Sequence, residues 1–314
     1  MTIRKRQRGA ALLTAMIIVT LVVTLASQMV WQQWRAVQVE TAERARLQSA
    51  WILSGALAWA QLILREDGKS GRPTALTEPW ATPLAEARLS TFLAVDKDNT
   101  GDDGPEAFLS GSIVDAQSRY NLRNLVDDNK VVEAELEGLR QLFETINVSP
   151  GVAERIATGL LQALAPAQTG AGGGSVPLPP ESVAQLAWFG IDSESIQLMS
   201  PYVVILPARA QVNLNTAPRE VMLAAITGLD VGTAERLIQV RQRTPFKTLP
   251  EVRTHLPEGL DVDDKRVTLK SDYFEIRGRL RLEDRVLEEI SLVHRSRGND
   301  IVPLTRRREN ARGS

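Results

Sequence analysis

The chain opens on a short basic leader that is followed at once by a long uncharged stretch. The leader, residues 1–9, carries a charge of +4, and the run from Ala10 to Val30 then has no charged residue over 21 positions. As an α-helix this run would be about 31 Å long, enough to cross the hydrocarbon core of a bilayer. The pattern predicts one transmembrane helix with its basic end in the cytoplasm and the rest of the chain on the other side of the membrane.

A conventional cleaved secretory signal is the main alternative for this segment. Such a signal has an apolar region of about 7–15 residues that ends in a small-residue cleavage motif. The apolar run here is longer, and no such motif precedes the globular sequence. The segment is therefore interpreted as an anchor.

The helical pattern continues beyond the apolar run. There is no proline from Trp31 to Arg65, and the first glycine in that interval is Gly55. Apolar residues recur there at three- to four-residue steps among Gln, Glu and Arg, namely Trp34, Val37, Ala45, Trp51, Leu53, Leu57 and Ala58. We expect one helix from Ala10 to about Arg65, about 84 Å long, with an apolar first half and an amphipathic second half.

Together, the leader that ends in Gly9, the apolar helix and its amphipathic continuation resemble the class III signal and spine helix of type IV pilins and pseudopilins. The resemblance implies that a prepilin peptidase cleaves between Gly9 and Ala10 and methylates the new amino terminus at Ala10. It also implies that the helix first anchors the subunit and then packs into a filament core. The first mature residue is usually Phe or Met in that family, so Ala10 departs from the pattern.

Thr14 stands at the fifth position after Gly9, where most pilins and pseudopilins carry a glutamate. A carboxylate in an apolar filament core is costly unless it is paired, and the family pairs it with the amino terminus of the adjacent subunit. Thr14 cannot offer that charge, although a threonine in a membrane helix can also simply bond a carbonyl one turn back. The absence of the glutamate resembles the K-type minor pseudopilins of type II secretion systems, which occupy the filament tip.

Composition argues against an enzyme. The chain has no cysteine, so thiolate nucleophiles and thiolate metal sites are excluded, and its only histidines, His255 and His294, lie far apart in sequence. "GKS" at Gly68–Ser70 lacks the glycine that a phosphate loop needs five residues earlier, and "GGGS" at Gly172–Ser175 is not a nucleophile elbow. The net charge of −1 and the pI near 6.2 give no general affinity for nucleic acid.

The remainder of the chain mixes strands and helices. "FLSGSIVDAQSRYNLRNLV" at Phe108–Val126 and "QVNLNTAPREVMLAAI" at Gln211–Ile226 each suggest a strand or turn and then a helix start, with Asn121 and Asn213 in equivalent places. Asn215 or Thr216 could cap the second helix. Both segments resemble signature stretches of the K-type family. Helices are expected at about Val131–Ile146, Pro150–Ala163, Glu181–Ala187, Ser193–Met199, Pro218–Ile226, Val231–Arg243 and Thr248–His255.

Near the C-terminus the period changes to two. Phe274, Ile276, Gly278, Leu280 and Leu282 alternate with polar residues, which predicts a half-buried strand, and Val286–His294 is expected to return as its partner. The predicted fold is α+β, a pilin-like α/β head with a large inserted all-helical domain. The expected parts are a cleaved leader at 1–9, a spine helix at 10–65 with 10–30 in the membrane, head segments at 66–122 and 268–295, a helical domain at 123–267, and a disordered tail at 296–314.

Within the helical domain, Leu214–Val252 resembles a helix-hairpin-helix module of DNA-uptake proteins. Its hairpin, Gly228–Gly232, carries Asp230 where such modules have an inner glycine that exposes an amide to a phosphate. A carboxylate there repels DNA, and Arg236, Arg241, Arg243 and Lys247 compensate only in part. A shared fold without DNA contact is the preferred interpretation, and a DNA-uptake or type IV pilus minor pilin is the alternative function.

A calcium site is a further candidate at "DKDNTGDDG". Asp96, Asp98, Thr100 and Asp102 have the 1-3-5-7 spacing of an EF-hand loop, but Ala107 occupies the twelfth position. A solvated acidic turn is the alternative, and "DVDD" at Asp261–Asp264 is a weaker second candidate. The family resemblance implies calcium in the head, and no other cofactor is expected.

The resulting hypothesis is a minor pseudopilin that sits at the pseudopilus tip and starts its assembly. The resemblance implies a tip complex with I- and J-type minor pseudopilins above an H-type subunit, together with contacts to the prepilin peptidase and the inner-membrane assembly platform. Trp31, Trp34 and Trp51 lie on the face expected to meet neighbouring spine helices. The protein is expected to be a single-pass inner-membrane protein with its C-terminal bulk in the periplasm.

Overall fold

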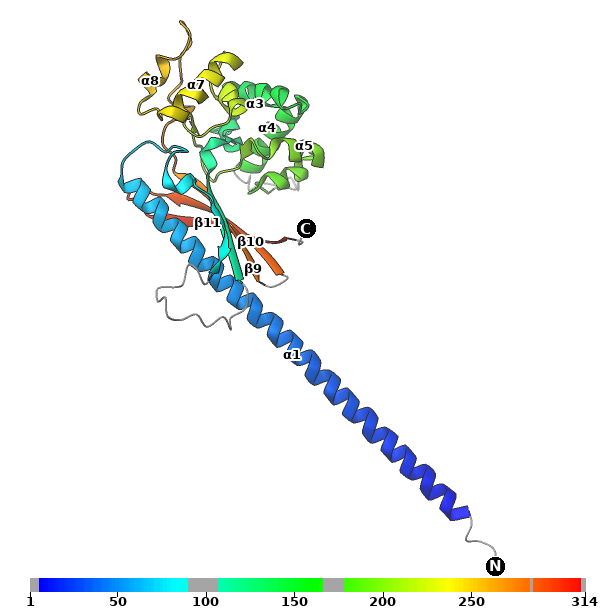
Figure 1. Cartoon of the computed structure of the whole chain (residues 1–314). Helices are drawn as coiled ribbons and strands as arrows, with labels where there is room; N and C mark the ends of the chain where they lie inside the picture. The colour runs from blue at the N-terminus through cyan, green and yellow to red at the C-terminus, as the bar shows by residue number, and fades with distance from the viewer. Residues whose placement is uncertain (1–5, 90–106, 166–177, 283–284, 312–314) are drawn as a thin grey trace, which may run out of the picture. The chain divides into compact units, whose positions relative to one another are not determined.

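A computed structural model describes residues 6–89, 107–165, 178–282 and 285–311 of the chain. The chain divides into two units, the first ending at Gly55 and the second beginning at Ala56, and each is described by itself. The first unit is helical. The second contains a sheet and a helical domain (Figure 1).

The helix α1 spans Arg6–Lys69, 64 residues without a break, and is therefore about 96 Å long. The helix predicted from Ala10 to about Arg65 is confirmed and extends by four residues at each end. Lys69 stands in the last turn, where a cation favours the negative end of the helix dipole. Gly71 follows with φ +67°, a left-handed conformation that stops helical propagation at little cost for glycine.

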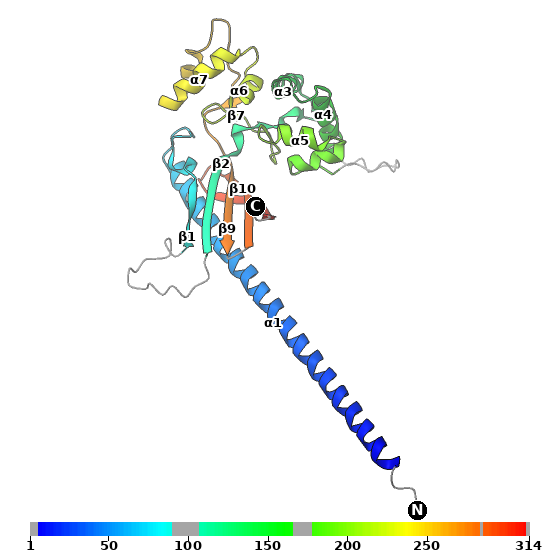
Figure 2. The same ribbon diagram turned by 45° about the vertical axis from the view of Figure 1, so that its right-hand side comes forward.

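Five antiparallel strands form the main sheet in the order β1-β2-β9-β10-β11. Their bounds are β1 Leu84–Arg88, β2 Ala107–Asp115, β9 Tyr273–Leu282, β10 Arg285–Arg295 and β11 Ile301–Ala311. β2 pairs with β9 in continuous register from Ala107 opposite Leu282 to Asp115 opposite Phe274. Sequence segments from both sides of the helical domain are thus central neighbours in one sheet, as the predicted insertion requires (Figures 1 and 2).

One face of the sheet is covered by the last turns of α1. Leu57, Ala60, Ile63 and Leu64 pack in a cluster with residues of the sheet and the short 3-10 helix η1 (Pro79–Ala81), namely Trp80, Ala81, Ile113, Phe274, Ile276, Val293 and Ile301. The Trp80 and Phe274 rings meet edge to face with their centroids 5.4 Å apart. The predicted alternation in β9 is confirmed in part. Phe274, Ile276, Leu280 and Leu282 are buried and Arg277 and Arg279 are exposed, but Glu275, which was expected to face solvent, is buried.

The prediction of a disordered tail at 296–314 is wrong over most of that range, because residues Ile301–Ala311 form β11. β11 pairs with β10 from Ile301 opposite Arg295 to Ala311 opposite Val286. The arginine run that looked solvated has a buried partner: Glu289 of β10 is 4% exposed and accepts bonds from Arg306 and from Arg308, the latter at 2.8 Å. A buried carboxylate needs such pairing, so these arginines hold the strand on the sheet.

The helical domain consists of two halves that repeat one plan. In the first half, β3 (Tyr120–Asn121) pairs in parallel with β6 (Val203–Val204), and in the second β7 (Val212–Asn213) pairs in parallel with β8 (Val267–Thr268). Between β3 and β6 lie η3 Leu122–Leu125, β4 Val126–Asp127, β5 Lys130–Val131, α3 Glu133–Thr145, α4 Gly151–Leu164, η4 Val183–Phe189 and α5 Ser193–Met199. Between β7 and β8 lie α6 Arg219–Ala225, α7 Val231–Arg243 and α8 Leu249–Arg253. The short helix η2, Ala116–Ser118, joins β2 to β3.

Asn121 and Asn213 hold equivalent places in the two halves, as predicted. The side-chain oxygen of each accepts a bond from the amide two residues on, Arg123 at 3.1 Å and Asn215 at 2.9 Å. Each turn then leads from a short strand into helix. Both halves contribute to a single hydrophobic core that includes Leu122, Leu139, Ile156, Leu214, Val221, Leu237 and Phe246.

The predicted helices are observed with shifts of a few residues, and two details are wrong. Neither Asn215 nor Thr216 caps α6, whose N-cap is Pro218 without a side-chain cap. The Asn215 side chain instead bonds both backbone groups of Phe246, and Thr216 bonds Asp115. The helix expected at Glu181–Ala187 is the 3-10 helix η4, whose C-cap, Gly190, has φ +74°.

Candidate functional site

The N-terminal part of α1 presents an apolar surface around its whole circumference. Between Leu12 and Val30 all twelve large apolar side chains of this stretch are at least 53% exposed. Residues from Ala11 onward form one helix long and apolar enough to span a membrane, and its most apolar window is not buried in the protein. A surface of this kind must be covered by lipid or by other apolar helices.

Hydroxyl side chains in this stretch do not make its surface polar. Thr20 bonds the carbonyls of Met16 and Ile17, Thr24 bonds that of Leu21, and Ser27 bonds that of Val23, all at 2.8–3.0 Å. Because these donors are satisfied within the helix, the outer surface offers a partner almost only dispersion contacts and shape.

The predicted processing and assembly residues lie on α1. The backbone of Gly9 and Ala10 is helical, and Thr14 is exposed one turn further on. The first turn of α1 contains no acidic residue, and no acidic residue occurs in the chain before Glu40. This end of the helix thus offers no carboxylate to a neighbouring amino terminus.

Aromatic side chains follow the apolar stretch. Trp31 and Trp34 are 57% and 56% exposed, with ring centroids 5.5 Å apart, and Arg35 lies over the Trp31 ring. Trp51 is 77% exposed. The two paired rings close a shallow groove lined by Val23, Ala26, Ser27, Val30, Trp31 and Trp34, which are spaced three and four residues apart. One stripe of the helix therefore carries small residues between larger ones, a shape into which a second helix can pack.

In the second unit, a buried polar node joins the sheet to the helical domain. Asp115 ends β2 and is 1% exposed. One carboxylate oxygen accepts bonds from Thr216 and Ser271 at 2.6 Å each and from Asn213 at 3.0 Å, while the other accepts from the Gln117 amide at 2.8 Å. Burial raises the pKa of Asp115, and these hydrogen bonds oppose that rise.

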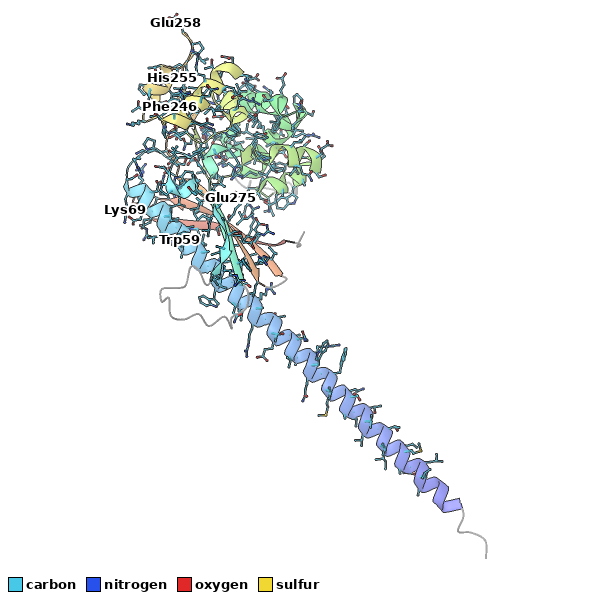
Figure 3. The ribbon with its side chains drawn as sticks, viewed as in Figure 1. Trp59, Lys69, Phe246, His255, Glu258 and Glu275 are labelled. Carbon is cyan, nitrogen blue, oxygen red and sulfur yellow. The ribbon has the colours of Figure 1, made fainter. Side chains whose placement is uncertain are left out.

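A second junction is ionic. Glu275 of β9, labelled in Figure 3, is buried. It accepts a bond from Arg119 at 2.9 Å and from Arg277 at 2.7 Å. Burial alone would raise the pKa of Glu275, but the two guanidinium groups outweigh it and leave the pKa below its ordinary value. These junction residues were missed from the sequence, although a polar residue at an inward strand position, such as Asp115, was the available signal.

In the helix-hairpin-helix-like segment, the residues that would contact DNA are engaged in bonds within the protein. Gly228 has φ +81° in the turn, and Asp230 caps α7 by accepting a bond from the Thr233 amide at 3.0 Å. The carboxylate therefore occupies the helix terminus where a phosphate would bind. Arg241 is buried and bonds the Leu214 carbonyl, and Arg236 bonds the His255 carbonyl at 3.0 Å, so these two cations are already engaged.

The calcium ligands predicted at Asp96, Asp98, Thr100 and Asp102 lie outside the described residues. Among the residues that the structure describes, no cluster of three or more acidic or histidine side chains could hold a metal. In the weaker candidate, Asp261 bonds Arg253 and the Val262 amide, and Asp263 accepts from the Lys265 amide. These contacts indicate a capped turn there.

Known proteins resemble the chain over nearly its full length. Two family models, both described as type II secretion system protein K, match residues 118–208 and 212–270, which correspond to the two halves of the helical domain. Type II secretion system protein K of Pseudomonas aeruginosa is 26% identical over 96% of this chain and 93% of its own length. The proteins of that name from Pectobacterium carotovorum and Dickeya chrysanthemi are 26% and 27% identical, over 93% and 95% of this chain and 94% and 96% of their own lengths.

The fold has a solved counterpart. A chain in the crystal structure of the GspK-GspI-GspJ complex from the type 2 secretion system of enterotoxigenic Escherichia coli superimposes with a TM-score of 0.63 at 20% identity. The match covers 86% of this chain and 99% of that one. The full-length relatives and both family models thus agree that the chain is similar to type II secretion system protein K.

Proposed function

We propose that this protein is the tip minor pseudopilin of a type II secretion system and that it starts assembly of the pseudopilus that exports folded proteins across the outer membrane. The role is structural and not catalytic. The observation that carries the proposal is an exposed apolar spine helix that lacks the acidic side chain at Thr14. Without that carboxylate the helix cannot form the usual charge pair with the amino terminus of a further subunit. A subunit of this kind fits the end of a filament.

The groove from Val23 to Trp34 supports the assembly role. In the membrane, Trp31 and Trp34 suit the interface at the end of the apolar stretch, where aromatic rings are favoured. In the filament, the same groove can receive the spine helix of a neighbour. The related Escherichia coli protein is solved with GspI and GspJ, which makes the I- and J-type minor pseudopilins the expected tip partners. An H-type subunit below them and the inner-membrane assembly platform complete the proposed set.

Processing and orientation are part of the same proposal. The basic leader stays in the cytoplasm, the prepilin peptidase cleaves between Gly9 and Ala10 and methylates Ala10, and the bulk of the chain lies in the periplasm. Mass spectrometry of the amino terminus of the protein purified from its own membranes tests this step. A peptide that begins at methylated Ala10 supports it, and a retained leader in the assembled protein contradicts it.

Thr14→Glu is the sharpest test of the tip assignment. The variant should still be processed, but its new carboxylate can pair with an incoming amino terminus, so crosslinks to the I- and J-type subunits should change and secretion should fall. Thr20→Glu is the matched control, because it introduces the same charge into the apolar stretch at a position that is not expected to meet the amino terminus. If Thr14→Glu crosslinks and secretes like wild type, the charge argument is wrong, whatever the family.

A deletion strain tests the role itself. Secretion of the exported proteins should be lost on deletion and restored by the wild-type gene, and normal export without the protein contradicts the proposal. The DNA-uptake alternative is disfavoured by the Asp230 cap. An electrophoretic shift with duplex DNA at low salt should be negative, and a salt-sensitive positive shift would favour that alternative.

A further inference from the structure

Two carboxylates are buried together where α1 ends. Asp67 lies in the last turn of α1 and Glu78 lies just before η1, and the side chain of each is 8% exposed. Buried carboxylates need partners, because an unpaired buried charge is costly. The question is how the four carboxylate oxygens are satisfied.

One oxygen of each residue has ordinary donors. Oε2 of Glu78 accepts bonds from the Ala75 amide at 3.1 Å and from Nε1 of Trp80 at 2.9 Å. Oδ2 of Asp67 accepts a bond from Nη1 of Arg295 at 3.0 Å. These contacts are typical of well-held buried carboxylates.

The other two oxygens have no donor within hydrogen-bond distance among the described residues. Oδ1 of Asp67 is buried, and no group in the described part of the chain donates to it. Oε1 of Glu78 lies 3.9 Å from Nε of Arg72, beyond hydrogen-bond distance, and the Arg72 side chain is 64% exposed. Asp67 and Glu78 are within hydrogen-bonding reach of each other. Since ionised carboxylates only accept, this bond forms only if one of them keeps a proton.

We propose that Asp67 and Glu78 share a single proton in the folded protein and form a pH-sensitive clamp between the end of α1 and the loop 70–78. Loss of the proton to a solvent base leaves two neighbouring buried carboxylates and no proton to bridge them. The clamp is then weakened by like-charge repulsion.

The surrounding charges do not remove this conflict. Arg295 also donates to Thr74 and to the Ser271 carbonyl, so its charge is divided among three acceptors. The other charged groups nearby are paired on the outside, Arg65 with Asp300 and Lys69 with Glu66. Burial raises the pKa of Glu78, bonds from Trp80 and Ala75 oppose this, and the neighbouring Asp67 raises it further.

The sign of the pH dependence follows. A carboxyl group whose pKa is higher in the folded than in the unfolded chain adds stability at low pH, and that stability is lost as the pH rises through the folded pKa. The clamp also connects to the helical domain. Thr74, in the same loop, donates its amide to the Leu269 carbonyl at 2.9 Å and accepts a bond from Asn213 at 3.0 Å.

The test uses the full chain in detergent micelles, with thermal unfolding followed by circular dichroism from about pH 5 to about pH 8. Glu78→Gln and Asp67→Asn each place a permanent N–H donor between the two groups, so both should flatten the pH dependence. Between these two pH values, the Tm of the wild type should fall by about 2–4 °C more than the Tm of either variant. Asp115 is unchanged in all three proteins, so its own titration cancels in the comparison. Glu66→Gln, an exposed neighbour, is the matched control and should retain the wild-type dependence.

A spectroscopic readout separates proton sharing from mere packing. In protein labelled with 13C at the glutamate carboxyl carbon, the resonance absent from Glu78→Gln belongs to Glu78 and should titrate above the other glutamates. In Asp67→Asn its midpoint should move down, because the amide donates to the ionised carboxylate. An ordinary midpoint unaffected by Asp67→Asn overturns the proposal, and so does an unchanged Tm profile in both amide variants.

Discussion

The Asp115 node allows a quantitative prediction about how the helical domain is held on the sheet. Asp115→Ala removes the acceptors of four donors. Asn213 keeps its bonds to Thr74 and Ser271, and Thr216 keeps a longer bond to the Asn213 carbonyl at 3.3 Å. The Ser271 hydroxyl and the Gln117 amide lose their only acceptor among the described residues.

The magnitude follows from those two orphaned donors. A buried polar group left without a partner costs about 1–3 kcal/mol, so Asp115→Ala should lower the free energy of unfolding by about 2–6 kcal/mol. Asp115→Asn keeps one acceptor oxygen, and the two hydroxyls can rotate to accept from its new amide group. Its cost should be about 1–2 kcal/mol, so the order of stability should be wild type, Asn, then Ala.

Thermal unfolding of the full chain in micelles measures the effect, and hydrogen exchange localises it. Asp115→Ala should lower Tm by at least about 4 °C, and protection should be lost first in residues 212–217 and 269–273. Asp272→Ala, which removes an exposed carboxylate beside Ser271, is the matched control and should change Tm by less than about 2 °C. If Asp115→Ala behaves like this control, the node does not hold the domain and the reasoning is refuted.

Three further predictions concern other parts of the chain. Glu275→Gln should destabilise the protein by about 3 kcal/mol at neutral pH, because the largely covered Arg119 side chain loses its counter-charge. Since the pKa of Glu275 is lowered, the wild-type advantage should disappear as the pH falls through that pKa, as read from urea unfolding at several pH values. Gly159→Ala should cost about 1–3 kcal/mol, because a Cβ there would lie 2.6 Å from the Phe189 ring, whereas Gly151→Ala meets no atom within 4 Å and should be nearly neutral in the same assay. Calcium binding at Asp96–Asp102 stays a prediction from the sequence: isothermal calorimetry should show heat that is lost in Asp96→Asn with Asp98→Asn, and no heat in the wild type removes the claim.

Periodicity carried most of what the sequence could predict. The uncharged run and the three- and four-residue steps after it were sufficient to place α1, because helix length and burial depend on local spacing. The alternation from Phe274 to Leu282 was sufficient for β9 for the same reason. Asn121 and Asn213 were recognised as equivalent because an Asx turn is also a local device.

The errors arose where a polar residue has a partner far away in the chain. Arg306 and Arg308 look like a solvated tail unless Glu289, some twenty residues earlier, is known to point inward on the neighbouring strand. Thr216 looks like a helix cap unless Asp115, about a hundred residues earlier, is known to end beside it. Local sequence rules assign such residues to roles near them in the chain, such as a helix cap or a solvated tail. In the folded protein they pair with a distant carboxylate, because a buried unpaired carboxylate costs more than a missing cap. The role proposed for Thr14 rests on the same asymmetry: a carboxylate buried at that position would need a charged partner, and a threonine hydroxyl does not carry that cost.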